Sequence, residues 1–288
     1  MVEWVGSLVG RTLVFSTPLL WAALGEIYAE RAGVVNLGVD GMMTLGAFFA
    51  FAVAQASGSP ELGLVVAAGA GGLAALLHAV VAVTLRANQY VSGLALGMFG
   101  VGLAGLLGRG WEGVPLGRSL PELSTVTYGG LILAAVLWVV LYHTRWGVVI
   151  RSAGESPGAA DAVGVNVSLV RYGAVVFGGV LAGIAGGYLS VAYRPSWTEG
   201  MTEGMGWIAI AIAIFAAWNP LQAIGGAVLF GALFHLSFRL QEWVSPELLK
   251  LMPYAITILA LALMAGRKSR RGRGAPEALG VPYVRGEQ

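Results

Sequence analysis

Four long stretches of the chain contain no Asp, Glu, Lys or Arg, and this feature limits the fold more than any other. They are residues 62–85, 87–108, 123–144 and 172–193, each bounded by charged residues. A helix that crosses a bilayer needs about 20 mainly apolar residues. Each of these windows therefore predicts one membrane-spanning helix.

The remaining apolar sequence is less regular. Residues 204–238 are uncharged but too long for one ordinary crossing, and Trp218-Asn219-Pro220 predicts a break because proline cannot continue the helical hydrogen-bond ladder. Before that break, 206–217 predicts a short or re-entrant helix whose ends need cover from protein or water. Further spans are predicted at 8–28, 37–57 and 248–266. Together the windows predict an all-α polytopic membrane protein with about nine transmembrane helices, in a range of eight to ten.

Composition excludes several classes of function. Only 11% of the residues are charged, against about 25% in an ordinary soluble domain, and 57% are hydrophobic. The net charge of +2 leaves no basic face for nucleic acid. The chain has no Cys, its three His are far apart, and neither Lys follows a Gly as a phosphate-binding loop requires. We therefore expect no metal, no cofactor and no catalysis in this chain.

Glycine is abundant, and three glycines recur at a four-residue spacing. Gly179, Gly183 and Gly187 form this series inside one predicted span. Small residues at this spacing let two membrane helices approach closely. Such spacings also arise by chance in glycine-rich helices, so the series alone leaves both interpretations open.

The distribution of charge predicts the orientation. Arg and Lys cluster between residues 267 and 273, at the start of a tail with almost no apolar run. Basic residues favour the cytoplasmic side of a membrane. We therefore expect residues 1–266 to form a transmembrane domain and residues 267–288 to form a disordered cytoplasmic tail. Nine crossings then place the N-terminus outside.

Polar residues and glycines interrupt the apolar sequence between residues 30 and 43. Asn36 and Asp40 lie in this interruption, just ahead of a predicted span. Broken helices of this kind line the substrate sites of many transporters, and a plain turn between two spans is the alternative. Glu26 lies near the end of the preceding span, where a functional role inside the membrane and a position at the interface are both open.

The longest polar interruption, 145–168, falls on the predicted cytoplasmic side. Ser156 predicts a helix cap with Pro157 in the first helical position. The alanines at 159, 160 and 162 favour helix, and Gly164 suits the position just after its end. The segment therefore predicts a short helix with a small-residue face, which either docks into a soluble partner or lies on the membrane surface.

Four motifs occur in order along the chain. They are Glu30-Arg31-Ala-Gly-Val-Val-Asn36-Leu-Gly-Val-Asp40-Gly, Asn88-Gln89-Tyr90-Val91-Ser92-Gly93, Glu155-Ser-Pro157-Gly-Ala159-Ala160-Asp161-Ala-Val-Gly164 and Gly206-Trp207-Ile208-Ala209 through Trp218-Asn219-Pro220-Leu221. Over roughly residues 20–265 the sequence resembles the membrane permease subunits of bacterial ABC importers for branched-chain amino acids, ribose-type sugars and nucleosides. The nucleoside and simple-sugar permeases are the most similar branch, although Asp40 stands where that branch more usually has glutamate.

This resemblance implies half of a translocation path in a bacterial plasma (inner) membrane. The implied partners are one or two ABC ATPase subunits, a second permease subunit that is a different paralogue, and an extracytoplasmic substrate-binding protein. The implied solute is a nucleoside or a related simple sugar. Residues expected to couple to the ATPase are Glu155, Pro157, Ala159, Ala160, Asp161 and Gly164. Residues expected in the path or its support are Asn36, Asp40, Asn88 and Ser92.

Two other classes of protein compete with this interpretation. A self-contained secondary transporter or channel for a small polar solute would need an internal coupling-ion site and often shows inverted repeats, which are not evident here. A membrane enzyme would need a paired nucleophile and base, and His78 and His235 lie in apolar windows without a nucleophile motif. Structural roles are therefore favoured for both histidines.

Overall fold

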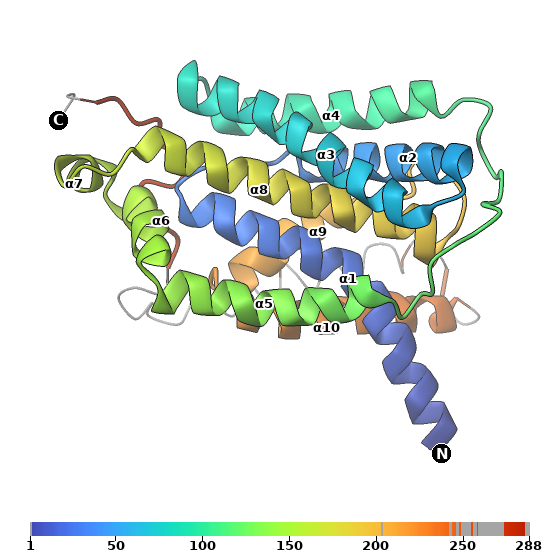
Figure 1. Cartoon of the computed structure of the whole chain (residues 1–288). Coiled ribbons are helices and arrows are strands. Elements are labelled where there is room, and N and C mark those ends of the chain that lie inside the picture. Colours follow the sequence, from blue (N-terminus) through green and yellow to red (C-terminus); the bar gives the residue numbers. More distant parts are fainter. Residues whose placement is uncertain are drawn as a thin grey trace.

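The structure is a bundle of helices that share one long direction (Figure 1). It is a computed structural model that describes residues 2–202, 204–241 and 274–285, together with residues 244, 245, 248, 255 and 258. In lipid every backbone N–H and C=O needs an internal partner, and a helix supplies that partner within its own segment. The uncharged windows of the sequence therefore become helices.

The long helices follow the predicted spans closely. They are α1 (Val2–Arg31), α2 (Val39–Ser57), α3 (Pro60–Ala79) with its π-helical extension η1 (Val80–Thr84), α4 (Gln89–Leu107), α5 (Thr125–His143), α8 (Val167–Tyr188) with its π-helical extension η2 (Leu189–Tyr193), and α10 (Pro220–Leu240). The shorter helices are α6 (Arg145–Glu155), α7 (Pro157–Ala162) and α9 (Met205–Phe215). The predicted short helix before Trp218-Asn219-Pro220 is confirmed as α9.

The predicted number of crossings is not confirmed. Among the described residues, seven helices are long and apolar enough to cross a membrane, and α9 is a shorter apolar helix. The predicted last span, 248–266, lies almost entirely outside the described residues. The described residues therefore support an all-helical membrane protein and supply seven candidate spans.

Side-chain caps and prolines set where most of these helices begin. At six helix starts a Ser, Thr or Asn side chain accepts a hydrogen bond from a backbone N–H of the first turn. These capping residues are Ser59, Asn88, Ser124, Thr144, Asn166 and Asn219. Pro60 and Pro220 occupy first helical positions, where the missing N–H costs nothing.

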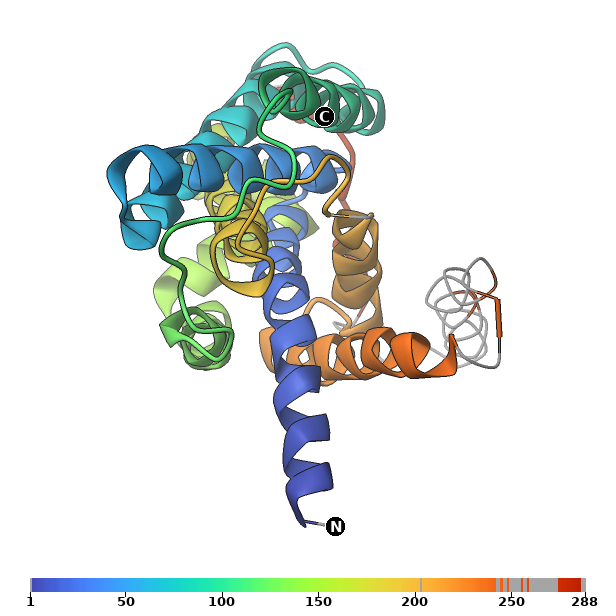
Figure 2. The same ribbon diagram turned by 90° about the vertical axis from the view of Figure 1, so that its right-hand side faces the viewer.

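Helices α1 and α8 form the centre of the bundle. Inside their best 18-residue windows, 89% of the residues of α1 and 78% of those of α8 are buried, against 28% for α4. Figure 2 shows α4 and α10 on opposite sides of the bundle, with α1 and α8 between them. The outward faces of the peripheral helices are therefore available to lipid or to other subunits.

Glycine allows the central helices to touch through their backbones. A Cβ atom at Gly179 or Gly183 of α8 would overlap backbone oxygens of α3. One at Gly187 of α8 would lie 2.8 Å from the Cβ of Ala67, which also belongs to α3. The predicted glycine series therefore forms a real helix contact, between α8 and α3. Close approach of this kind replaces the hydrophobic driving force that lipid cannot supply.

Candidate functional site

The segment of α6 and α7 crosses one end of the bundle (Figure 1). Pro157 occupies the first turn of α7 and Gly164, with φ of +90°, follows the helix end, as predicted. Ser156 is the N-cap residue, but its side chain makes no capping hydrogen bond. Ala160 is buried against Ala153 of α6, whereas Val163 is 80% exposed. One side of this segment therefore anchors it to the bundle and the other side is free.

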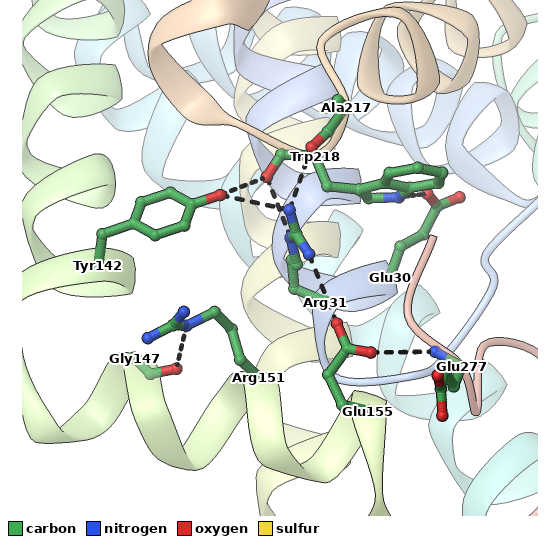
Figure 3. Close-up of polar contacts among 9 residues, drawn as sticks. All are labelled: Glu30, Arg31, Tyr142, Gly147, Arg151, Glu155, Ala217, Trp218 and Glu277. Atoms are coloured by element: carbon green, nitrogen blue, oxygen red, sulfur yellow. Dashed lines mark hydrogen bonds and ion pairs between the residues drawn. The ribbon is translucent and has the colours of Figure 1, made fainter. Parts of the chain in front are cut away.

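A buried arginine connects this segment to two other parts of the chain (Figure 3). Arg31, at the end of α1, is 3% exposed and lies 3.8 Å from the Glu155 carboxylate at the end of α6. Its guanidinium also donates to the backbone oxygens of Trp218 at 3.2 Å and Ala217 at 3.1 Å, and to the Tyr142 hydroxyl at 3.3 Å. A guanidinium has five donors in a fixed plane, so one side chain can bridge three elements.

The turn that Arg31 holds has an unusual backbone. Ala217 and Trp218 have φ of +48° and +54°, a conformation that costs energy in residues other than glycine. The indole N–H of Trp218 donates to the buried Glu30 carboxylate. Asn219 and Pro220 then start α10. The Glu30-Arg31 and Trp218-Asn219-Pro220 motifs, which are far apart in sequence, therefore form one contact.

Part of the C-terminal tail lies against the same end of the bundle. The N–H of Ala278 donates to the Gly154 oxygen at 2.9 Å, and the N–H of Glu277 donates to the Glu155 carboxylate at 3.3 Å. Arg285 forms an ion pair with Asp161 of α7 at 3.0 Å. Residues 274–285, which the sequence places in a disordered tail, therefore strap α6 and α7.

A second polar region lies where α1 gives way to α2. The connecting residues are not helical, and Asn36 in their middle is fully buried. Its amide donates to the Glu26 carboxylate at 3.2 Å, and its side-chain oxygen accepts from the N–H of Gly38 at 3.1 Å. Glu26 is only 1% exposed. Protein therefore covers the Glu26 side chain, which does not reach out to the interface as considered above.

This break extends to about the middle of the bundle. The backbones of Gly41 and Gly97 touch, and Gly97 is the ninth of the 19 residues of α4. Asp40 is half-buried at the start of α2, and its carboxylate accepts from the N–H of Gly206 at 3.1 Å. Helix α9 therefore begins at Asp40, deep in the bundle, and runs toward the end where Arg31 lies.

The other predicted path residues lie nearer the end of the bundle that carries α6 and α7. Asn88 is exposed and caps α4 by accepting from the N–H of Val91 at 3.1 Å. Ser92 contacts His78 at 3.0 Å, and the other ring nitrogen of His78 lies 2.9 Å from the backbone oxygen of Val35. The structural role favoured for His78 fits this contact, which fastens the connection between α1 and α2 to α3 and α4.

Sequence reasoning did not nominate the residues that join these parts. Glu30, Arg31 and Trp218 were recognised in motifs, yet no role was assigned to them. Arg171 was also missed, although it is buried and donates to the backbone oxygens of Ala32 and Val281. Each of the two arginines lies at the end of an apolar segment, and this position in the sequence was the signal that could have found them.

Comparison with known proteins identifies the family. The family described as the permease component of the branched-chain amino acid transport system matches residues 8–261. The chain belongs to this permease family. It is a multi-pass membrane subunit of an ABC transporter, and ATP hydrolysis resides in a separate subunit of such a transporter.

Several relatives match along their whole length. A putative glucose ABC transporter permease protein of Haloferax volcanii is 36% identical over 99% of both chains. The guanosine ABC transporter permease protein NupQ of Bacillus subtilis is 34% identical over 100% of this chain and 99% of its own. The nucleoside ABC transporter permease protein NupC of Lactococcus lactis is 33% identical over 99% of both chains. No solved structure matches.

Proposed function

We propose that this permease forms one half of the path of an ATP-driven nucleoside importer, and that α6 and α7 receive the motion of the ATPase. The observation that carries this proposal is the bridge made by Arg31. It joins Glu155, the last residue of α6, to the turn between α9 and α10. A push on this segment therefore reaches the membrane helices through the ion pair between Glu155 and the buried Arg31.

The proposed docking surface consists of the exposed part of α7 and the turn after it. Ala159 and Gly164 are exposed and small, and the apolar side chain of Val163 is exposed beside Gly164. Ala160 is buried and Pro157 is half-buried, and Asp161 forms an ion pair with Arg285 of the tail. ATP binding can shift the permease between its two states only if the docking contact differs between them. We place that difference at this surface.

Nucleosides are the proposed solute. Relatives named as guanosine and nucleoside permeases match the chain from end to end, and a putative glucose permease matches equally well in length. The residues of the motif from Glu30 to Asp40 resemble those of the nucleoside permeases more than those of the sugar permeases. We place Asn36 and Asp40 in the path and Ser92 and Asn88 in its support, because the first two lie in the break inside the bundle.

The partners and the orientation follow from the same proposal. We infer two ATPases, a second and different permease subunit, and an extracytoplasmic binding protein, in the plasma membrane of a bacterium. The tail lies on the same end of the bundle as α6 and α7, so a cytoplasmic docking surface also places residues 274–285 in the cytoplasm. The division into a transmembrane domain, 1–266, and a basic tail, 267–288, belongs to this proposal.

Co-purification tests the assembly directly. The tagged chain is extracted from its native membrane and its companions are identified by mass spectrometry. We expect an ATPase and a second permease, and the purified complex should take up guanosine into liposomes only with ATP and the binding protein. A chain that purifies alone and still moves solute would overturn the proposal in favour of a secondary transporter.

A further inference from the structure

A pocket opens on the side of the bundle between α4 and α9. It has a volume of about 370 Å³, and Asp40, Leu94, Met98, Gly102 and Trp207 are among the residues that line it. Small-molecule sites in proteins usually have volumes of ~300–1,000 Å³. The pocket is thus large enough to hold a small solute.

The depth of this pocket argues against contact with lipid. Met98 is the tenth of the 19 residues of α4, so the pocket lies near the middle of the span. The Asp40 carboxylate is the ionisable group in its wall, and such groups rarely face lipid at this depth because hydrocarbon cannot solvate them. They face the interior of an assembly or a water-filled cavity instead. The α4–α9 side of this permease therefore faces the path.

The backbone at the pocket has the form expected of a path. Both α2 and α9 begin beside Asp40, inside the bundle, and non-helical backbone leads into each of them. Backbone of this kind is tolerated at membrane depth only where protein or a water-filled cavity covers it. The N–H of Gly206 donates a hydrogen bond to one oxygen of Asp40, which fixes the carboxylate at the pocket wall.

We propose that the transported nucleoside occupies this pocket, with its base against Trp207 and a ribose hydroxyl donating to Asp40. This assignment rests on the proposed function. Trp207 is 42% exposed and offers an aromatic face, and Met98, at 72% exposed, adds a polarisable apolar wall. A carboxylate accepts hydrogen bonds from hydroxyl groups, so the pocket combines a partner for the base with a partner for the sugar.

Cysteine labelling tests whether the pocket meets water. The natural chain has no Cys, so Met98→Cys or Gly102→Cys introduces a single thiol into the pocket. The matched controls are Leu73→Cys on α3 and Ile132→Cys on α5, because these residues are 67% and 64% exposed and also lie near the middle of their spans. Each variant is assembled with its partner subunits in lipid nanodiscs and treated with a water-soluble maleimide, which reacts with thiolate.

The expected result is rapid labelling at both pocket positions and slow labelling at both controls. Guanosine should slow labelling in the pocket, whereas leucine should not. Pocket thiols as unreactive as the controls would mean that lipid covers this side, and the proposal would be wrong. Reactive thiols that saturating guanosine leaves unprotected would also overturn it. Gly102→Cys guards against misfolding of the other pocket variant, because no atom lies within 4 Å of a Cβ at Gly102.

A change of one atom in Asp40 tests the assigned contact. Asp40→Asn keeps an oxygen for the N–H of Gly206 but weakens the acceptor offered to a hydroxyl. In the Gly102→Cys background, the guanosine concentration that halves labelling should rise about tenfold. That concentration should change little for whichever analogue, 2′-deoxyguanosine or 3′-deoxyguanosine, lacks the hydroxyl that contacts Asp40. An equal shift for guanosine and for both its 2′-deoxy and 3′-deoxy analogues would reveal a purely structural role and overturn the assignment.

Uptake by the unmodified transporter separates this proposal from the function on which it rests. ATP-driven guanosine uptake without any protection in the pocket would refute the pocket and leave the proposed function standing. The absence of nucleoside uptake by the assembled transporter would refute the proposed substrate itself.

Discussion

Reversal of charge at Glu155 tests the link between α6 and the membrane helices. Glu155 lies 3.8 Å from Arg31, and its side chain is 42% exposed. Two unit charges at this separation interact by about 1 kcal/mol in water and by roughly 4 kcal/mol at an effective dielectric constant of 20. Because Glu155 is partly exposed, the lower figure applies. Glu155→Lys replaces this attraction with a repulsion of similar size, so it should lower the free energy of unfolding by about 2 kcal/mol.

The functional effect of Glu155→Lys should exceed its effect on stability. Arg31 keeps its hydrogen bonds to the backbone oxygens of Ala217 and Trp218, so the bundle should still fold and assemble. The contact between α6 and α1 becomes repulsive, and coupling energies of 1–3 kcal/mol correspond to roughly 5- to 150-fold. ATP-driven guanosine uptake by proteoliposomes should therefore fall at least tenfold.

Glu122→Lys is the matched control. Glu122 is 39% exposed and pairs with Arg11 at 2.9 Å, at the end of the bundle opposite α6 and α7. This variant changes charge by the same amount and should lower the melting temperature similarly while uptake stays near wild type. Wild-type uptake by Glu155→Lys, or equal losses in both variants, would refute a specific link through Arg31.

Three further predictions concern the stability of the fold. Arg31→Met should destabilise the subunit by about 1–3 kcal/mol in thermal unfolding, since it leaves the backbone oxygens of Ala217 and Trp218 and the partly exposed Glu155 carboxylate without their partner. Gly186→Val should lower the yield of folded protein because its Cβ would overlap a backbone oxygen of α2, whereas Gly173→Ala, with open space around it, should not. Removal of residues 274–288 should speed hydrogen exchange in α6 and α7, as measured by mass spectrometry, and unchanged exchange would show that the strap contributes nothing there.

The helices could be predicted because the bilayer limits their length and charge. The uncharged windows correspond to α3, α4, α5 and α8, and Trp218-Asn219-Pro220 correctly separates α9 from α10. The start and end of α7 could also be predicted, because Pro157 and Gly164 act through their own backbones. Such features depend on neighbours in sequence, and so the sequence alone is sufficient to predict them.

The polar contacts could not be predicted because their partners are distant in sequence. Arg31 meets Trp218 and Glu155 only after α1, α6 and α10 have packed, and no periodic pattern reports that arrangement. Glu26 was ambiguous for the same reason, since its burial depends on where the chain goes after α1 ends. The strap formed by residues 274–285 escaped prediction because its contacts are mostly made by backbone atoms, which composition does not reveal.

Helix α9 connects the two candidate sites. Its 11 residues span about 16 Å. At its start, the N–H of Gly206 is held by Asp40 beside the pocket, and just after its end the backbone oxygen of Ala217 is held by Arg31. A short helix fixed at both ends moves as a unit. Motion of α6 should therefore reach the pocket wall through α9.

This connection predicts that a change at Glu155 alters how the pocket responds to ATP. In the assembled transporter, ATP should change the rate at which the Met98→Cys thiol is labelled, because α9 moves relative to α4. Adding Glu155→Lys should abolish that response to ATP while labelling without nucleotide stays unchanged, and adding Glu122→Lys should preserve it. A double variant with Glu155→Lys that still responds fully would show that the signal bypasses Arg31. A claim of coupling needs an element with two states whose equilibrium both sites shift. This measurement tests α9 as that element, because it perturbs the Arg31 end through Glu155 and measures labelling in the pocket at the other end.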